Sequence, residues 1–180
     1  MNTVGKFPRI LVNAKTVQLN KKIYLSIFII IASFLLDRFS KLYVIENFIK
    51  NNFKDQFINE FLNFTLIWNK GIAFGLLQSE TFFYHLISFF ILLIVLFIFY
   101  LIIKSATVLE ITCFSLISGG ALGNLYDRFY YNAVPDFIDL HYGSFHWFTF
   151  NVSDIFITLG IILLLIFDIF KFNKTDKEND

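Results

Sequence analysis

The sequence predicts a mainly α-helical membrane protein with four transmembrane helices, a small extracytoplasmic β structure and a short interfacial helix. Apolar residues make up 57% of the 180 residues and charged residues only 16%, whereas soluble domains carry about 25% charge. The mean hydropathy is +0.66. Four apolar runs are each long enough to cross a hydrocarbon core of about 30 Å. The length fits a single integral-membrane domain over residues 1–180.

The first span is expected over about 23–45, after a basic cytoplasmic tail at 1–22. This apolar run is too long for the h-region of a signal peptide, about 7–15 residues, and no small-x-small cleavage site follows it, so we expect a retained helix. The other spans are expected over about 82–103, 107–126 and 151–171, followed by a polar tail at 172–180 that we expect to be disordered.

Two loops on the outer side contain further predicted structure. The segment 47–57 has the pattern of an amphipathic helix on the membrane surface, with Phe48, Phe53 and Phe57 as anchors. The run FLNFTLIWNKGIAFG, 61–75, alternates partly like a β-strand up to a turn at 69–71. In the second loop, 127–150, two β-rich runs flank Gly143 and Ser144 and predict a hairpin.

Composition excludes several classes of function. The net charge is +1 and no basic patch is interleaved with aromatic residues, so we expect no nucleic-acid partner. The single cysteine, Cys113, excludes a disulfide within the chain and a zinc cluster with several thiolates. His141 and His146 lie on the predicted hairpin without an obvious third ligand, so no metal and no cofactor are expected.

Charge distribution predicts that both termini are cytoplasmic. With that orientation, nine Lys and Arg residues fall on the cytoplasmic side and six on the outer side. Most of the unusual polar residues of the membrane part then fall in one layer at the extracytoplasmic interface, whereas Glu110 and Asp168 lie at the other face without such clustering. Carboxylates this close to lipid are costly and usually have a function. The layer contains Asp37, Arg38, Lys41, Asn69, Gly71, Asn124, Asp127, Arg128, Asp136, Asp139 and Asp154.

We interpret Asp136 and Asp154 as a catalytic pair, because a hairpin between them would return the chain and bring the carboxylates together. Two carboxylates that share a site hold one proton between them. The ionised one can deprotonate a water, and the protonated one can hydrogen-bond the scissile carbonyl, which gives peptide hydrolysis without a metal. If Asn151 caps the last helix, its N-terminus favours an ionised Asp154 and leaves the proton mainly on Asp136.

Structural interpretations of the same acids stay open at this stage. Asp154 can be a helix-capping residue only, and Asp136 a turn residue beside Pro135. Asp127 and Arg128 can form an ion pair at a helix end. Asp37 and Lys41 have the i,i+4 spacing of a pair on one helix face. The corresponding alternative functions are a proton- or ion-coupled membrane transporter and a non-enzymatic membrane scaffold.

Five motifs occur in an order that resembles bacterial lipoprotein signal peptidase, also called signal peptidase II or prolipoprotein signal peptidase. They are DRxxK from Asp37, NxGxAFG from Asn69, GGALGNLYDR from Gly119, PDFID from Pro135 and FNVSD from Phe150. The resemblance covers roughly residues 23–171. Each motif is weak alone, but five in order on four spans are highly specific.

The resemblance implies a four-helix aspartic peptidase with an outer β-cradle and a small periplasmic helix, which acts as a monomer in the bacterial cytoplasmic (inner) membrane. Its substrates would be diacylglyceryl prolipoproteins, cut before the lipidated cysteine, and globomycin-like cyclic peptides would inhibit it. The family's catalytic aspartates correspond to Asp136 and Asp154. Its support residues correspond to Asn69, Gly71, Asn124, Asp127, Arg128, Asn151, Asp37 and Lys41.

Two positions depart from the family pattern. Pro135 stands where the family usually has a small β-branched residue, and Ser153 stands where it usually has alanine. Proline removes a backbone donor and stiffens the chain before Asp136. Neither departure touches the acids, so they bear on catalytic efficiency and leave the assignment unchanged.

Overall fold

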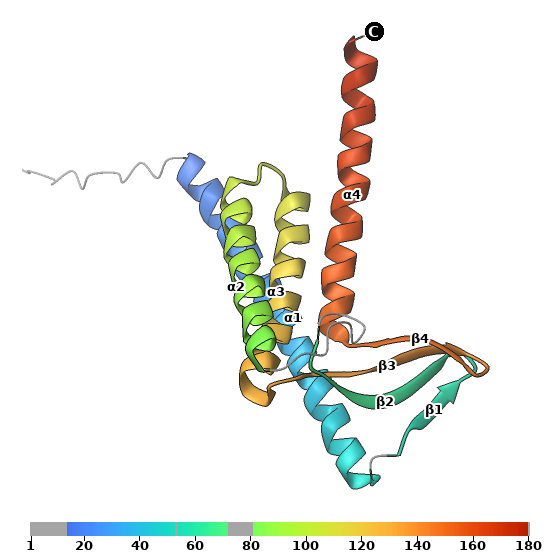
Figure 1. Ribbon diagram of the computed structural model, residues 1–180. Helices are drawn as coiled ribbons and strands as arrows, with labels where there is room; N and C mark the ends of the chain where they lie inside the picture. Colours follow the sequence, from blue (N-terminus) through green and yellow to red (C-terminus); the bar gives the residue numbers. More distant parts are fainter. Residues whose placement is uncertain (1–13, 53, 72–80, 180) are drawn as a thin grey trace, which may run out of the picture.

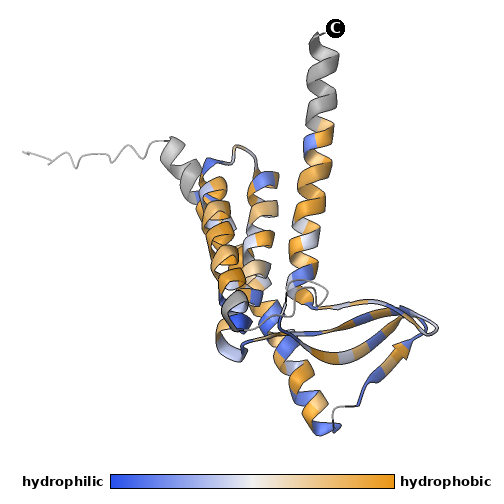
Figure 2. Cartoon of the chain, viewed as in Figure 1, coloured by the Kyte–Doolittle hydropathy of each residue, from blue (hydrophilic) through white to orange (hydrophobic). Residues whose placement is uncertain are grey.

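Four helices and one sheet make up the described part of the chain (Figure 1). The computed structural model describes residues 14–52, 54–71 and 81–179. The helices are α1 (Ala14–Lys50), α2 (Thr81–Lys104), α3 (Val108–Tyr131) and α4 (Val152–Asn179). Each contains a stretch long and apolar enough to cross a membrane: Lys21–Lys50, Tyr84–Lys104, Val108–Tyr131 and Val152–Phe170. The four predicted spans are therefore confirmed, and in Figure 2 hydrophobic residues predominate along α2 and along the coloured part of α4.

Three helices extend well beyond the ends that hydropathy predicts, and one of them is α3, which ends at Tyr131 instead of at about 126. α1 begins at Ala14, inside the segment expected to be a tail, and α4 continues to Asn179, through the segment expected to be disordered. Neither α1 nor α4 contains a proline, and Gly160 is the one glycine in α4. Without such residues nothing in the local sequence stops a helix where the apolar run ends.

The interfacial helix predicted over 47–57 was wrong. α1 runs on to Lys50, the chain turns at Asn52 with a left-handed φ of 55°, and strand β1 (Gln56–Asn59) begins four residues later. Phe48 is 2% exposed and packs with Val44 and Phe137 instead of anchoring in lipid. Phe57 is 71% exposed, and Phe53 lies outside the described residues.

The sheet is antiparallel, in the order β1-β2-β3-β4. The predicted β segment is confirmed as β2 (Leu62–Asn69), and the predicted hairpin as β3 (Val134–Tyr142) and β4 (Phe145–Phe150), joined through Gly143, whose φ is 59°. Because β2 pairs with β3, Asn69 lies opposite Val134 and Ile67 opposite Asp136. The segment between α1 and α2 therefore places Asn69 beside the strand that carries Asp136.

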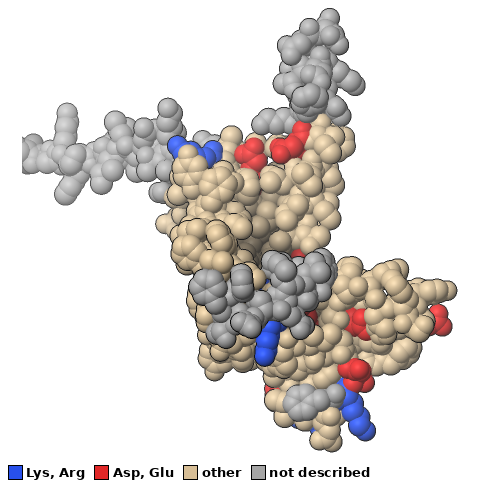
Figure 3. All heavy atoms as spheres, in the orientation of Figure 1, with Lys and Arg blue, Asp and Glu red and all other residues tan. Residues whose placement is uncertain are grey.

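α3 is the central helix of the bundle, since it packs against α1, α2 and α4. Close packing of α3 depends on Gly119 and Gly123: a Cβ at Gly119 would collide with Ser33 of α1, and one at Gly123 with Asp37 of α1 and Ser153 of α4. α4 diverges from the other three helices with distance from the sheet (Figure 1). The faces seen in Figure 3 carry few charged side chains along the helices.

Candidate active site

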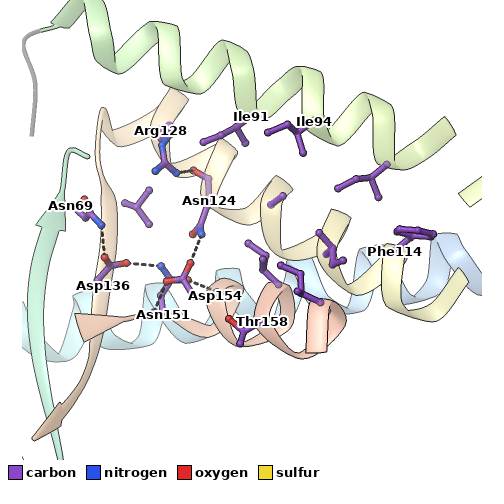
Figure 4. A pocket seen from close by; sticks show the side chains of 16 residues that line it. Asn69, Ile91, Ile94, Phe114, Asn124, Arg128, Asp136, Asn151, Asp154 and Thr158 are labelled. Atoms are coloured by element: carbon purple, nitrogen blue, oxygen red, sulfur yellow. Dashed lines mark hydrogen bonds between the residues drawn. The ribbon is translucent and has the colours of Figure 1, made fainter. Parts of the chain in front are cut away.

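The two predicted catalytic aspartates line one cavity of about 540 Å³ (Figure 4). Its polar end is formed by Asp136, Asp154 and four other side chains from the sequence prediction, namely Asn69, Asn124, Arg128 and Asn151. The remainder is a mainly apolar groove between α2, α3 and α4, lined by six isoleucines together with Phe114, Ala121, Val134 and Thr158. The cavity thus joins an apolar groove at membrane depth to a carboxylate pair at one end.

Asp136 lies on β3 and is 4% exposed. Asn69 Nδ2 donates to Asp136 Oδ2 at 2.8 Å, and Asn151 Nδ2 donates to Oδ1 at 2.6 Å. Asn69 is oriented by the turn that follows it, because its Oδ1 accepts a hydrogen bond from the Gly71 backbone N–H at 2.9 Å. Each oxygen of the Asp136 carboxyl therefore has one amide donor.

Asp154 lies in the first turn of α4, where the predicted helix cap is confirmed. The Asn151 backbone N–H donates to Asp154 Oδ2 at 3.1 Å, and the Asp154 N–H donates to Asn151 Oδ1 at 3.2 Å. Asn124 Nδ2 from α3 donates to Asp154 Oδ1 at 2.8 Å. Asn151 thus contacts both aspartates. Its side-chain nitrogen donates to the Asp136 carboxyl, and its side-chain oxygen accepts from the Asp154 backbone N–H.

The environment of Asp136 favours its protonated form. Burial raises the pKa of Asp136 to about 6, and the negative charge of Asp154 acts in the same direction. The amide donors Asn69 and Asn151 oppose this shift but do not cancel it. The Asp136 carboxyl therefore keeps its proton to a higher pH than an ordinary aspartate does.

A buried lysine fixes the orientation of Asn124. Lys41 has no exposed surface, and its Nζ donates to Asp37 Oδ2 at 2.9 Å, Asn124 Oδ1 at 2.9 Å and Asp127 Oδ2 at 2.6 Å. Because the carbonyl oxygen of Asn124 is taken by Lys41, its NH₂ group faces Asp154. Asp37 also accepts from the Ser153 backbone N–H at 2.9 Å, which ties α1 to the start of α4.

The ion pair considered between Asp127 and Arg128 is not formed. Asp127 pairs instead with Lys41 and with Arg38, whose Nη2 lies 2.5 Å from Asp127 Oδ1. Arg128 donates to two backbone carbonyls, from Nη2 to Gly71 O at 2.9 Å and from Nη1 to Asn124 O at 3.3 Å. Consecutive helical residues point about 100° apart, so the two side chains serve different neighbours.

Two contributors were missing from the predicted site residues. Arg38, a member of the DRxxK motif, completes the ion cluster around Asp127. Tyr84 of α2 donates from its hydroxyl to the Arg128 carbonyl oxygen at 3.0 Å. Adjacency to Asp37 could have indicated Arg38, whereas nothing in the sequence around Tyr84 distinguishes it from an ordinary interfacial tyrosine.

Asp139 is not part of this cavity. It lies three residues beyond Asp136 on β3, an odd spacing that places it on the opposite face of the sheet. Its Oδ2 lies 2.8 Å from His146 Nδ1, and the His146 ring stacks on that of His141 with a centroid distance of 5.3 Å. Among the described residues, no group of three or more His, Cys, Asp or Glu side chains is arranged to hold a metal ion.

The two departures from the family pattern are both buried beside the aspartates. Pro135 is fully buried in β3 opposite Trp68, directly before Asp136. Ser153 has no exposed surface, and its Oγ has no hydrogen-bond partner in the described part of the chain. The backbone of Ser153 nevertheless keeps its bond to Asp37. Of the NxGxAFG motif, Ala73, Phe74 and Gly75 lie outside the described residues.

Fold and site together define a polytopic membrane protein in which two aspartates, the buried Asp136 and the part-buried Asp154, close an apolar cavity at one end. Comparison with known proteins gives that class a family. The family model for signal peptidase (SPase) II matches residues 29–170. The chain therefore belongs to the signal peptidase II family.

Individual relatives agree with this assignment. The lipoprotein signal peptidase of Pelagibacter ubique (strain HTCC1062) is 45% identical over 161 residues, which cover 89% of this chain and 96% of the relative. That of Anaplasma phagocytophilum (strain HZ) is 40% identical over 139 residues, covering 76% and 86%. A solved structure described as a bacterial membrane enzyme at 2.3 Å resolution superimposes with a TM-score of 0.60 at 30% identity, covering 82% of this chain and 86% of that one.

Proposed function

We propose that this protein is an aspartic endopeptidase of the bacterial cytoplasmic membrane that removes signal peptides from diacylglyceryl prolipoproteins, cutting before the lipidated cysteine. The observation that carries the proposal is the shared cavity of Asp136 and Asp154, in which Asn151 contacts both carboxyls. The relatives' name, lipoprotein signal peptidase, supports the substrate class.

In this proposal the ionised Asp154 accepts a proton from a water molecule, whose oxygen attacks the scissile carbonyl carbon. Asp136 gives its proton to the carbonyl oxygen, and a tetrahedral diol forms. The diol collapses when Asp154 passes its proton to the leaving nitrogen and Asp136 takes one back from a hydroxyl. The C–N bond breaks, and both aspartates return to their starting protonation states.

The roles of the two acids follow from their surroundings. Asp154 lies at a helix N-terminus and accepts from a backbone N–H, both of which stabilise an anion. Asp136 lies on a strand, away from a helix end, and its raised pKa favours the proton. The two carboxyls titrate as a coupled pair, so this is a preference between two arrangements of one proton.

The buried charges around the cavity support a single shared proton. Apart from the catalytic pair, three buried cations face two buried carboxylates: Arg38, Lys41 and Arg128 against Asp37 and Asp127. Their sum is one positive charge, so the whole group is neutral when the pair carries one negative charge. Burying a net charge is expensive, and the singly protonated pair avoids that cost.

The apolar part of the cavity fits the other half of the substrate. A signal peptide is an apolar helix, and the groove between α2, α3 and α4 offers it an apolar wall at membrane depth. Its cleavage site must unwind to expose a peptide bond, and backbone groups freed at membrane depth need polar partners. Beyond the polar end, the described residues lining the groove include no further acid, which disfavours a proton or ion pathway.

We propose the same orientation that the charge distribution predicts, with both termini in the cytoplasm and the aspartates at the outer face. Lys22 donates to the carbonyl oxygens of Ser105 and Ala106, so the basic start of α1 and the short α2–α3 turn lie together. That basic end of the bundle is opposite the sheet (Figure 1). The positive-inside rule places it in the cytoplasm.

The substrate assignment is tested with the purified protein in liposomes and one prolipoprotein in two forms, with and without diacylglyceryl on its cysteine. We expect cleavage of the lipidated form alone, and mass spectrometry should place the new N-terminus at the lipidated cysteine. Cleavage of both forms at equal rates would contradict the substrate class, and a cut at another bond would contradict the proposed specificity.

A further inference from the structure

A second cavity lies beside the first and shares Asp154 of α4 with it. It has a volume of about 390 Å³ and lies between α4 and strand β4. Asp154 and Thr158 line both cavities. Asp154 is therefore reached from two sides, from the groove between α2, α3 and α4 and from this second groove, which we call the β4 groove.

The β4 groove is apolar apart from the two shared residues. Its walls are Phe148 and Phe150 of β4 and Ile155, Leu159 and Ile162 of α4. The three α4 residues recur at the i, i+4, i+7 spacing of one helix face. They extend about 10 Å along the axis, at 1.5 Å per residue. They are 42%, 44% and 47% exposed, so the groove is open along its length at membrane depth.

The proposed substrate has two apolar arms that diverge from the bond to be cut. The signal peptide precedes that bond, and the cysteine directly after it carries the diacylglyceryl group on its sulfur. An arm on that cysteine must begin beside the catalytic carboxylates. The larger cavity has polar donors for the peptide backbone. The β4 groove is smaller and, apart from Asp154 and Thr158, has only apolar walls.

We infer that the β4 groove seats an acyl chain of the thioether-linked diacylglyceryl group while the larger cavity holds the signal peptide. This inference rests on the proposed function and assigns the second arm of the same substrate. The argument for this occupant is adjacency: Asp154 and Thr158 line both the groove and the cavity, so a chain attached at the cut site starts beside the groove.

Binding of the acyl chain in the β4 groove would act by positioning the cysteine that carries it. Lipid tails are as apolar as isoleucine and phenylalanine, so moving an acyl chain from bilayer to groove gains little hydrophobic free energy. Holding the chain instead fixes the cysteine relative to the two carboxyls, and small displacements at a reacting centre have large effects on rate. The expected effect is therefore on cleavage rate and depends on chain length.

Photocrosslinking tests where the chain lies. A lipidated prolipoprotein with a diazirine in one acyl chain is bound to Asp136→Asn protein in nanodiscs, irradiated and mapped by mass spectrometry. We expect crosslinks on Phe148 and on the 155–162 face of α4. The same pattern from a diazirine phospholipid not joined to peptide, or crosslinks centred on Leu165, would overturn the inference.

Cleavage kinetics test whether binding of the acyl chain in the β4 groove affects the rate. Leu159→Trp fills the β4 groove, and Leu165→Trp is the matched control, because Leu165 is 58% exposed on α4 and lines neither cavity. With a dipalmitoyl substrate we expect kcat/KM of Leu159→Trp to fall by about tenfold, a modest misplacement of the reacting bond. With a diacetyl substrate it should equal that of the control. Equal losses on both substrates, or no loss on either, would overturn the inference.

The two proposals fail differently. If the unaltered protein does not cleave lipidated substrate, or if Asp136→Asn still cleaves it, the proposed function fails. If cleavage depends on both aspartates but is indifferent to Leu159→Trp, only the β4-groove inference fails. The crosslink map uses an unaltered groove, so it remains decisive even if the tryptophan variant does not fold.

Discussion

Asp136 combines burial with a nearby negative charge, and its stability contribution must therefore depend on pH. Its pKa rises from 3.8 to about 6 in the folded protein. A carboxyl with a raised folded-state pKa contributes most below its unfolded pKa, and the contribution is lost as the pH rises through about 6. The full loss corresponds to about 3 kcal/mol at 1.36 kcal/mol per pKa unit.

Asp136→Asn cannot ionise, so it lacks this pH dependence. We predict that from pH 4 to pH 8 the wild type loses up to about 3 kcal/mol of unfolding free energy relative to the variant. Denaturant unfolding in detergent at a series of pH values measures the difference. Asp139→Asn, a change on the opposite face of the same strand, is the control. Parallel curves for the wild type and Asp136→Asn would contradict the assigned environment.

The buried hydroxyl of Ser153 is expected to lower the free energy of unfolding. This hydroxyl has no partner in the described part of the chain, and a buried unsatisfied polar group costs about 1–3 kcal/mol. Ser153→Ala should therefore stabilise the fold by about 1 kcal/mol and preserve cleavage, since the backbone bond to Asp37 remains. Ser115→Ala is the opposite control, because Ser115 Oγ donates to buried Ser26 at 2.9 Å. Destabilisation by both changes would mean that the Ser153 hydroxyl is satisfied.

At the scale of the element, α1 carries two lysines with the same i,i+4 pairing in opposite environments. Lys41 and Asp37 have no exposed surface, whereas Lys50 and Glu46 are 66% and 67% exposed. Removing one partner of a buried pair leaves an uncompensated charge and costs about 3–5 kcal/mol. An exposed pair contributes at most about 1 kcal/mol.

We therefore predict that Lys41→Met destabilises the protein by about 3–5 kcal/mol and slows cleavage, because Asn124 loses the partner that orients it toward Asp154. Lys50→Met should change neither quantity measurably. Unfolding in detergent and prolipoprotein processing are measured for both variants. A stable, fully active Lys41→Met protein would show that the buried cluster is not required for the site.

The contact of α3 with α1 and α4 depends on the absence of a side chain at Gly123. A Cβ there would lie 2.5 Å from Asp37 Oδ2 and would collide with Ser153. Gly123→Ala should therefore separate Asp37 from Ser153, lower the thermal unfolding temperature and reduce cleavage. Gly143→Ala is the control: its added Cβ meets no atom within 4 Å, and its left-handed φ of 59° costs only about 1 kcal/mol. Equal effects of the two changes would argue against close packing at Gly123.

At the scale of the whole molecule, the sequence predicted the features that depend on local pattern. Long apolar runs predict the spans, Gly143 and Ser144 predict the hairpin, and Asn151 followed by Asp154 predicts the cap. The aspartate pair could be proposed because carboxylates are rare at membrane depth and because these two stand at the ends of a hairpin.

Features that depend on packing between distant segments could not be predicted in this way. The contact of Asn69 with Asp136 follows from the β2–β3 register, and the pairing of Asp127 with Arg38 follows from the rotation of α3 against α1. Phe48 looked like a membrane anchor, but β3 brings Phe137 against it. The end of α1 was misplaced because no breaker residue marks the membrane boundary.

If Asp136 and Asp154 together perform the hydrolysis, loss of either carboxylate must abolish processing of lipidated prolipoprotein, which a gel-shift assay measures. Wild type, Asp136→Asn, Asp154→Asn and Asp139→Asn are reconstituted in liposomes after circular dichroism has confirmed equal folding. We expect full processing by wild type and Asp139→Asn, and none by Asp136→Asn or Asp154→Asn. Processing at the wild-type rate by folded Asp136→Asn or Asp154→Asn would contradict the joint role of the two aspartates.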